Sequence, residues 1–338
     1  MMFRNVMNRS VQAVAAIVAV MLLGSPAATA QALKTINVGM QPIVNGPIYI
    51  AIKEKYFEKM GLKVNLVKFT SGPAQFAALA GGQIDLAWGG MGAFLLAKAN
   101  GQDLNFFAVF MDYNPLEGIA VPGASPVRSV RDLAGKKVAL VRGSDAHYGL
   151  LKALQANGMA KNAVDILNMA PPQQTAALEA GDVDAVFSWE PFLTPLTKKG
   201  ARIIFRNSDL HPGPAFLGWA GHRAWLEKNR DVVVKLLKGW DMGLKKMHED
   251  PELAISTAME FTGMNVDQAH AVQKQLVYYP ATAAIDPKEP CYWAKGSKLN
   301  RLMHDFLAFG KEYGLVKGDT DVDGYVMPQF MEAVKSGK

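Results

Sequence analysis

The sequence predicts an α/β protein with two Rossmann-like lobes that are joined by a hinge of two chain crossings. From Thr35 onward, short β-rich runs alternate with helix-like stretches, which is typical of parallel βαβ units. The same alternation returns after residue 130, and a block of helical character follows Phe216. A late helical block that packs on the first lobe would make that lobe discontinuous in sequence.

The first alternation predicts three strands, at Thr35–Met40, Lys63–Phe69 and Ile84–Trp88. Between the first two strands, Pro47–Lys59 places apolar side chains at helical spacing, and Gly61 provides a stop. Between the second and third, a shorter helix is expected to begin at Gly72–Pro73 and to end at Gly81–Gly82.

The second alternation predicts strands at Lys137–Val141, Val164–Met169 and Val183–Phe187, with a helix from about His147 to Asn157. The late block is predicted to contain successive helices at Arg223–Gly243, Pro251–Thr262, Val266–Leu276 and Lys298–Tyr313.

A short segment occurs twice. Residues Ala77–Asp85 are echoed at Ala176–Asp184, and in both copies a helix ends at glycine before a β-branched residue and an aspartate. A common lobe architecture explains this echo, although helix–Gly–strand turns reuse the same residues in many α/β proteins. The expected division is a leader at 1–30, one lobe at 31–116 and 216–338, and a second lobe at 117–215. The crossings are expected near Leu116–Val121 and Pro214–Ala220.

The N-terminus has the pattern of a cleaved export signal. Arg4 and Arg9 precede the apolar stretch Val11–Leu23, and the small residues Ala28–Ala30 follow it. This stretch is too short to anchor the chain, because a transmembrane helix needs about 20 apolar residues. The expected location is therefore the periplasm. The lone Cys291 cannot form an internal disulfide, and it is interpreted as a small buried apolar residue.

Composition and motifs argue against several classes of function. The formal charge of +6 falls by two when Arg4 and Arg9 leave with the leader, and no basic cluster appears, so nucleic-acid binding is not expected. Nucleophile-elbow, Walker and His-Glu-x-x-His motifs are missing, and the histidines lack metal-ligand spacing. Ser144, Asp145 and His147 are too close in sequence for a relay with a separate buried acid. No catalysis, cofactor or metal is predicted.

In open parallel sheets, ligands bind beyond the carboxyl ends of the strands, at helix N-termini. This rule selects the loops Gln41–Pro47, Thr70–Pro73, Gly89–Gly92, Val141–His147 and Ser188–Pro191. Glycines there would allow close approach of a ligand, although they could equally serve only the turns. The candidate ligand-binding residues are Asn45, Gly46, Ser71, Gly72, Gly90, Met91, Arg142, Ser144, Asp145, His147, Trp189, Glu190 and Trp219.

Glu190 stands out among these candidates. A carboxylate between Trp189 and Pro191 at a strand end would be costly to shield from water without a cationic partner. That partner could be an amine of the ligand or a neighbouring Arg or Lys, and the sequence leaves both open.

The order of several motifs resembles the taurine, aliphatic-sulfonate and nitrate binding proteins of ABC importers (NMT1/THI5-like). The resemblance spans nearly the whole chain after the leader. It is carried by Ser71-Gly72 before Ala77-Ala78-Leu79, the run Asp132–Ala139, the helix His147–Leu154, and Pro171-Pro172 followed by the Trp189-Glu190-Pro191 loop.

This resemblance implies a type II periplasmic binding fold, a monomeric receptor, and delivery of the solute to a permease and ATPase complex at the inner membrane. It also implies that an anion is held at the positions matching Ser71 and Ser144. Asp145 and Glu190 depart from that pattern, because carboxylates repel an anion unless Arg142 or a positive ligand group intervenes. The departure favours a zwitterion such as an amino sulfonate, or an organic amine.

Two alternative functions remain open at this stage. Relatives in the same family act in thiamine-pyrimidine transport and synthesis, although those carry cysteine-rich motifs and this chain has only Cys291. A binding protein that presents its ligand to a membrane sensor would have the same sequence features as one that feeds an importer.

Overall fold

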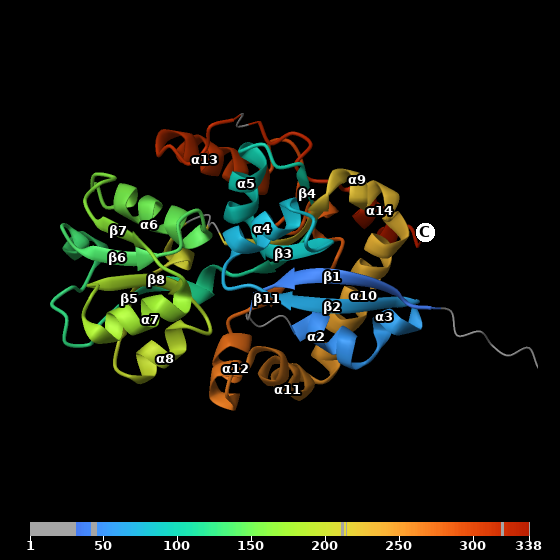
Figure 1. The fold of residues 1–338 in the computed structure, drawn as a ribbon, viewed down its shortest axis with the longest axis horizontal. Coiled ribbons are helices and arrows are strands. Elements are labelled where there is room, and N and C mark those ends of the chain that lie inside the picture. The colour runs from blue at the N-terminus through green and yellow to red at the C-terminus, as the bar shows by residue number, and fades with distance from the viewer. Residues whose placement is uncertain (1–31, 42–45, 211–212, 214, 319–320, 338) are drawn as a thin grey trace, which may run out of the picture. The chain divides into compact units, whose positions relative to one another are not determined.

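The computed structural model describes residues 32–41, 46–210, 213, 215–318 and 321–337. The predicted leader and Asn45 lie outside these residues. Two separate sheets organise the described chain, and helices cover both (Figure 1). The predicted α/β class is therefore confirmed. Within the described residues, no helix is long and apolar enough to cross a membrane.

The larger sheet has six strands in the order β11-β4-β10-β3-β1-β2. Strands β1, β2 and β3 are parallel, whereas β10 runs antiparallel to both β3 and β4. The strands are β1 (Lys34–Met40), β2 (Leu62–Lys68), β3 (Leu86–Gly90), β4 (Leu104–Asp112), β10 (Phe216–His222) and β11 (Val277–Tyr278).

The smaller sheet has five strands in the order β7-β6-β8-β5-β9. Strands β6, β7 and β8 are parallel, and β5 runs antiparallel to β8 and β9. The strands are β5 (Glu117–Val121), β6 (Lys137–Leu140), β7 (Asp165–Asn168), β8 (Ala185–Trp189) and β9 (Arg202–Arg206). In Figure 1, α6 lies on one face of this sheet and α7 and α8 lie on the other.

The helices follow the predicted alternation, except that the single helix expected over Arg223–Gly243 is divided at Asn229 into two helices. They are α2 (Gly46–Lys53), α3 (Tyr56–Lys59), α4 (Gly72–Ala80), α5 (Met91–Ala99), α6 (Asp145–Ala156), α7 (Pro171–Ala180), α8 (Leu193–Lys198), α9 (Arg223–Lys228), α10 (Arg230–Glu249), α11 (Pro251–Thr262), α12 (Val266–Gln273), α13 (Lys298–Glu312) and α14 (Gln329–Lys335).

The two sheets share one strand order, and the repeated sequence segment explains part of it. In each sheet the first of the three parallel strands lies between the second and the third, and an antiparallel strand lies beside the third. The Asp85 carboxylate accepts from the Asn37 N–H of β1 at 2.7 Å, and the Asp184 carboxylate accepts from the Lys137 N–H of β6 at 2.9 Å. The aspartate that ends each copy of the repeat therefore binds the first parallel strand of its own sheet.

The chain passes between the sheets twice. It leaves the larger sheet after β4 and enters the smaller one at β5, and it returns from β9 to β10. The two connections lie side by side, because the Tyr113 N–H donates to the Ala215 carbonyl at 2.8 Å and the Ala215 N–H donates to the Asn114 side chain at 2.8 Å. The crossings were expected near Leu116–Val121 and Pro214–Ala220. Most of these residues belong to strands β5 and β10, and each connection lies immediately before its strand.

The single helix expected over Pro47–Lys59 is wrong. The structure has α2 and α3 instead, because Lys55 adopts a left-handed backbone conformation with φ 56°. The turn brings Phe57 against Gly239 of α10, where an added Cβ would lie 2.1 Å from the Phe57 ring. Packing against α10 therefore overrides the helical spacing of the sequence.

Large aromatic side chains fill the core of the larger sheet. Trp88 of β3 and Trp219 of β10 lie opposite each other in register, and both are fully buried. The Trp219 ring also contacts Phe110 of β4 and Trp240 of α10 at centroid distances of 5.5 and 6.4 Å. Offset and edge-to-face contacts of this kind stabilise beyond the area that they bury. This aromatic cluster stabilises the larger sheet, and the ends of its strands β1 and β3 carry part of the candidate site.

Candidate functional site

Three helix N-termini meet where the parallel strands of the two sheets end. α4 begins at Gly72, α5 begins at Met91 directly after Gly90 ends β3, and α6 begins at Asp145 after Ser144. The free N–H groups and the positive end of the helix dipole make such termini favourable for negative groups. Neither α4 nor α5 has an acidic residue in its own first turn.

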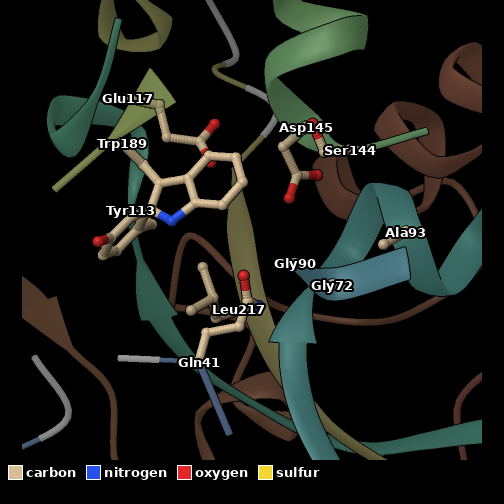
Figure 2. A pocket seen from close by; sticks show the side chains of 10 residues that line it. All are labelled: Gln41, Gly72, Gly90, Ala93, Tyr113, Glu117, Ser144, Asp145, Trp189 and Leu217. Carbon is tan, nitrogen blue, oxygen red and sulfur yellow. The ribbon is translucent and has the colours of Figure 1, made fainter. Parts of the chain in front are cut away.

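A small cavity lies among these termini (Figure 2). Its volume is about 20 Å³, which is room for about one water molecule. Its walls come from elements of both sheets and from the first connection between them. The lining residues are Gln41, Gly72, Gly90, Ala93, Tyr113, Glu117, Ser144, Asp145, Trp189 and Leu217.

Asp145 closes one side of the cavity. Its carboxylate accepts a hydrogen bond of 2.7 Å from the Gly92 N–H in the first turn of α5. An added Cβ at Gly90 would lie 1.8 Å from the Asp145 Oδ2, and one at Gly92 would lie 2.6 Å from the Oδ1. Both positions therefore require glycine for the carboxylate to reach α5.

Glu117 is the second carboxyl group at the cavity, and Figure 2 shows it extending from β5 toward the same space as Asp145. Its Oε2 accepts from the Asn207 amide at 2.6 Å. Burial raises the pKa of Glu117 well above its usual value, and the nearby Asp145 raises it further. Burial likewise raises the pKa of Asp145 to about 7, against the lowering effect of the Gly92 N–H.

Gln41 reaches the cavity from the end of β1, and Figure 2 shows its amide pointing into the space. Only 7% of its surface is exposed. Among the described residues, the Gln41 amide has no hydrogen-bond partner. The amide of Gln41 is therefore available to a bound molecule.

The predicted serine positions differ in their surroundings. Ser144 lines the cavity, and its hydroxyl donates to the Val141 carbonyl at 2.8 Å. Ser71 is buried at the N-cap of α4, but it is not among the lining residues. The adjacent Gly72 does line the cavity, so α4 faces it through its backbone.

Arg142 and His147 do not line the cavity. The exposed Arg142 guanidinium donates to the Ile166 carbonyl of β7 at 2.9 Å, so it does not compensate the two carboxyl groups. The His147 Nδ1 accepts from the Gly143 N–H at 3.2 Å. Burial, with the Arg142 charge, lowers the pKa of His147 to about 4, so its ring is neutral at pH 7.

Among the two predicted tryptophans, only Trp189 lines the cavity. Trp219 belongs to the aromatic core described above and has no exposed surface. Gly46 and Met91 are buried at the starts of α2 and α5 but do not line the cavity.

Glu190 is buried beside the site and points its carboxylate at a different helix. The Glu190 Oε2 accepts from the Thr194 N–H at 2.9 Å, in the first turn of α8. Burial raises its pKa, while Thr194 and the charge of Arg206 lower it. Its backbone carbonyl accepts from the Tyr113 hydroxyl at 2.6 Å. Glu190 therefore supports the wall formed by Tyr113, and it is not among the lining residues.

Sequence reasoning missed five lining residues. Tyr113 and Glu117 flank the first connection, and Leu217 lies just after the second. A crossing between lobes passes through the cleft between them, so the predicted crossings were the signal that could have identified these three. Gln41 lay inside a selected loop, but its amide was not singled out, and Ala93 carries no sequence signal. The missed residues are Gln41, Ala93, Tyr113, Glu117 and Leu217.

Known proteins resemble this chain in sequence and in fold. The family described as NMT1/THI5 like matches residues 44–254, more than half of the chain. The "Putative aliphatic sulfonates-binding protein" of Bacillus subtilis (strain 168) is 34% identical over 229 residues, which are 64% of this chain and 67% of that protein. The taurine-binding periplasmic protein of Escherichia coli (strain K12) is 28% identical over 298 residues, which are 85% of this chain and 89% of that protein.

A solved structure supports the fold. The periplasmic aliphatic sulphonate binding protein SsuA from Escherichia coli aligns with a TM-score of 0.70 at 24% identity, covering 84% of this chain and 88% of that one. The predicted resemblance is thus confirmed by sequence and by fold, and this chain belongs to the NMT1/THI5-like family.

Proposed function

We propose that this protein is the periplasmic solute-binding component of an ABC importer for a small sulfonate or amino sulfonate. The names of its relatives support this class of ligand, since they include aliphatic sulfonate-binding and taurine-binding proteins. In this proposal the larger sheet with residues 31–116 and 216–338 forms one lobe, and residues 117–215 form the other. The solute binds between them, and a permease and ATPase complex at the inner membrane accepts it.

The observation that carries the proposal is the cavity at the N-termini of α4, α5 and α6. The N-terminus of α5 already receives the Asp145 carboxylate. The N-terminus of α4 presents Gly72 to the cavity and has no acid in its first turn. A sulfonate would therefore bind at Gly72, where backbone N–H groups and the helix dipole favour an anion.

The size of the cavity bears on how the ligand enters. A space of about 20 Å³ admits one water molecule and excludes any organic sulfonate. Entry of an organic sulfonate would therefore require the two lobes to separate. The paired connections at Tyr113 and Ala215 are the segments about which this hinge motion would occur.

Export and lack of catalysis are further parts of the proposal. The leader at residues 1–30 would direct the chain to the periplasm. The thiol of Cys291 is buried, and burial raises its pKa to about 12, so it is unsuited to nucleophilic chemistry. In the described residues, no group of His, Cys, Asp or Glu side chains could hold a metal ion.

A thermal-shift screen of the purified protein without its leader tests the function. The panel contains taurine, propane-1-sulfonate, β-alanine, nitrate, a simple amine and an aminopyrimidine. A ligand at a hundredfold excess over its Kd stabilises the folded state by about 2.7 kcal/mol. Compounds of the class that the protein binds should therefore raise its melting temperature clearly. A response to the pyrimidine alone would favour the thiamine-precursor alternative, and chemical conversion of any ligand would overturn the receptor function.

A further inference from the structure

We infer that Glu117, Asp145 and Gln41 form a subsite for the ammonium group of the solute, so that the protein selects amino sulfonates over plain alkanesulfonates. This inference rests on the proposed function, because it assigns the ammonium and the sulfonate of the solute to opposite ends of the same site.

The two carboxyl groups lack a cation of the protein. Glu117 and Asp145 are 5% and 4% exposed, and both line the cavity. Neither forms an ion pair with any Lys, Arg or His in the described part of the chain. Their hydrogen-bond donors are neutral groups, the Asn207 amide and the Gly92 N–H. Buried carboxylates require a positive partner to remain charged, and a ligand ammonium would supply it.

Gln41 is an independent pointer to a ligand. Its side chain is more than nine-tenths buried, is aimed into the cavity, and has no partner among the described residues. The amide oxygen of Gln41 is an acceptor, as are the carboxylates of Glu117 and Asp145. A primary ammonium group has three N–H donors. The cavity therefore offers one acceptor from each of three side chains to a group with three donors.

A plain alkanesulfonate does not satisfy these groups. Its polar atoms are all acceptors, and it carries a negative charge toward two carboxyl groups, which would repel it or force both to take up protons. Trp189 adds to the preference, because an aromatic ring beside the space attracts a cation more strongly than a methyl group. The sulfonate of a zwitterion would bind at Gly72, away from the acids.

Titration calorimetry with a matched pair of ligands tests the inference. Taurine and propane-1-sulfonate have the same length, and a methyl group replaces the ammonium in the second. We expect the wild-type protein to bind taurine at least about a hundredfold more tightly, since a buried charged hydrogen bond to a ligand is worth that much or more. Glu117→Gln should weaken taurine at least about tenfold and leave propane-1-sulfonate unchanged or tighter.

The control variant is Glu179→Gln, which removes a carboxylate that pairs with Lys199 on the surface. It should bind both ligands as the wild-type protein does. A second measurement uses only the wild-type protein, so it tests the inference even if Glu117→Gln does not fold. Calorimetry at pH 7 in buffers of different ionisation enthalpy measures proton exchange. Taurine should release protons, because the ammonium favours the charged carboxylates, whereas propane-1-sulfonate should take protons up.

The outcomes separate this inference from the proposed function. If propane-1-sulfonate binds within about tenfold of taurine, or if taurine binding takes up protons, the ammonium subsite is wrong while the sulfonate receptor stands. If β-alanine binds with proton release and neither sulfonate binds, the subsite is supported and the sulfonate class of the proposed function is wrong.

Discussion

The Asp145 carboxylate accepts a hydrogen bond from the Gly92 N–H at 2.7 Å. Asp145 begins α6, which follows β6 of the smaller sheet, whereas Gly92 lies in the first turn of α5, which follows β3 of the larger sheet. This single bond therefore joins the cavity-lining ends of the two sheets, and it places a carboxylate where a helix N-terminus would otherwise attract an anion.

A side chain at position 90 should prevent this contact. In Gly90→Ala, the new Cβ would lie 1.8 Å from the Asp145 Oδ2, so Asp145 or α5 must move. Overpacking of this kind costs about 1–3 kcal/mol of unfolding free energy, and we expect affinity for the solute to fall with it. Urea denaturation and titration calorimetry measure the two effects.

Gly81→Ala is the matched control, because Gly81 has φ −79° and its nearest neighbour to an added Cβ is 3.4 Å away. The double variant Gly90→Ala with Asp145→Ala removes the clashing oxygen and should recover stability. Wild-type stability and affinity in Gly90→Ala alone would show that the two sheets do not approach as closely in solution.

The ligand-free protein should lose stability as the pH rises from about 4 to about 7. The folded-state pKa of Asp145 is raised from 3.8 to about 7, so the folded state holds this proton more tightly than the unfolded state over that window. Between these two pKa values, the unfolding free energy falls by about 1.4 kcal/mol as the pH rises by one, or by a few kcal/mol in total. Burial raises the pKa of Glu117 as well, so this group contributes in the same direction.

Asp145→Asn should remove the part of this dependence that Asp145 contributes, because asparagine can still accept from Gly92 and carries no charge. The variant should therefore gain stability over the wild-type protein at pH 8 and gain little at pH 4. A difference between the two proteins that stays constant across this range would mean that Asp145 is not buried in the ligand-free protein.

Local signals in the sequence determined many elements of the fold. Helix α11 was predicted over its full length because its boundaries are marked chemically. The Asp250 side chain caps the Leu253 N–H at 3.2 Å, Pro251 opens the helix, and Gly263 ends it with φ 78°. By contrast, the break between α2 and α3 depends on Lys55, a residue with no preference for the left-handed conformation, and only packing on α10 explains it.

The candidate site was predictable only where it follows parallel strands. Ser144 and Asp145 were found because they follow β6, and Gly72 and Gly90 because they adjoin β2 and β3. Glu117 was missed because it opens the antiparallel strand β5, to which the rule for parallel strands does not apply. Its place at the cavity depends on how the two connections pack, which is a long-range property that no local pattern encodes.

The two candidate tryptophans should behave differently. Trp189→Phe should weaken solute binding, because this side chain lines the cavity. Trp219→Phe should leave affinity unchanged and lower unfolding free energy by about 1–3 kcal/mol through lost packing. The loss is limited because the Trp219 Nε1 has no partner in the described structure, so phenylalanine removes an unsatisfied donor. Equal loss of affinity in both variants would return Trp219 to the list of ligand contacts.

Glu190 provides the last test, because the sequence suggested that it meets a positive group of the solute. In the structure its Oε2 accepts from the Thr194 N–H at 2.9 Å, at the start of α8, and the side chain does not line the cavity. We therefore expect Glu190→Gln to bind taurine within about twofold of the wild-type protein, since distant rim charges contribute little. Glu190→Ala should lose about 1 kcal/mol of unfolding free energy, because the N–H of Thr194 loses its acceptor. Calorimetry and urea denaturation of both variants decide the role. A loss of taurine affinity of tenfold or more in Glu190→Gln, with propane-1-sulfonate unaffected, would move the ammonium subsite from Glu117 to Glu190.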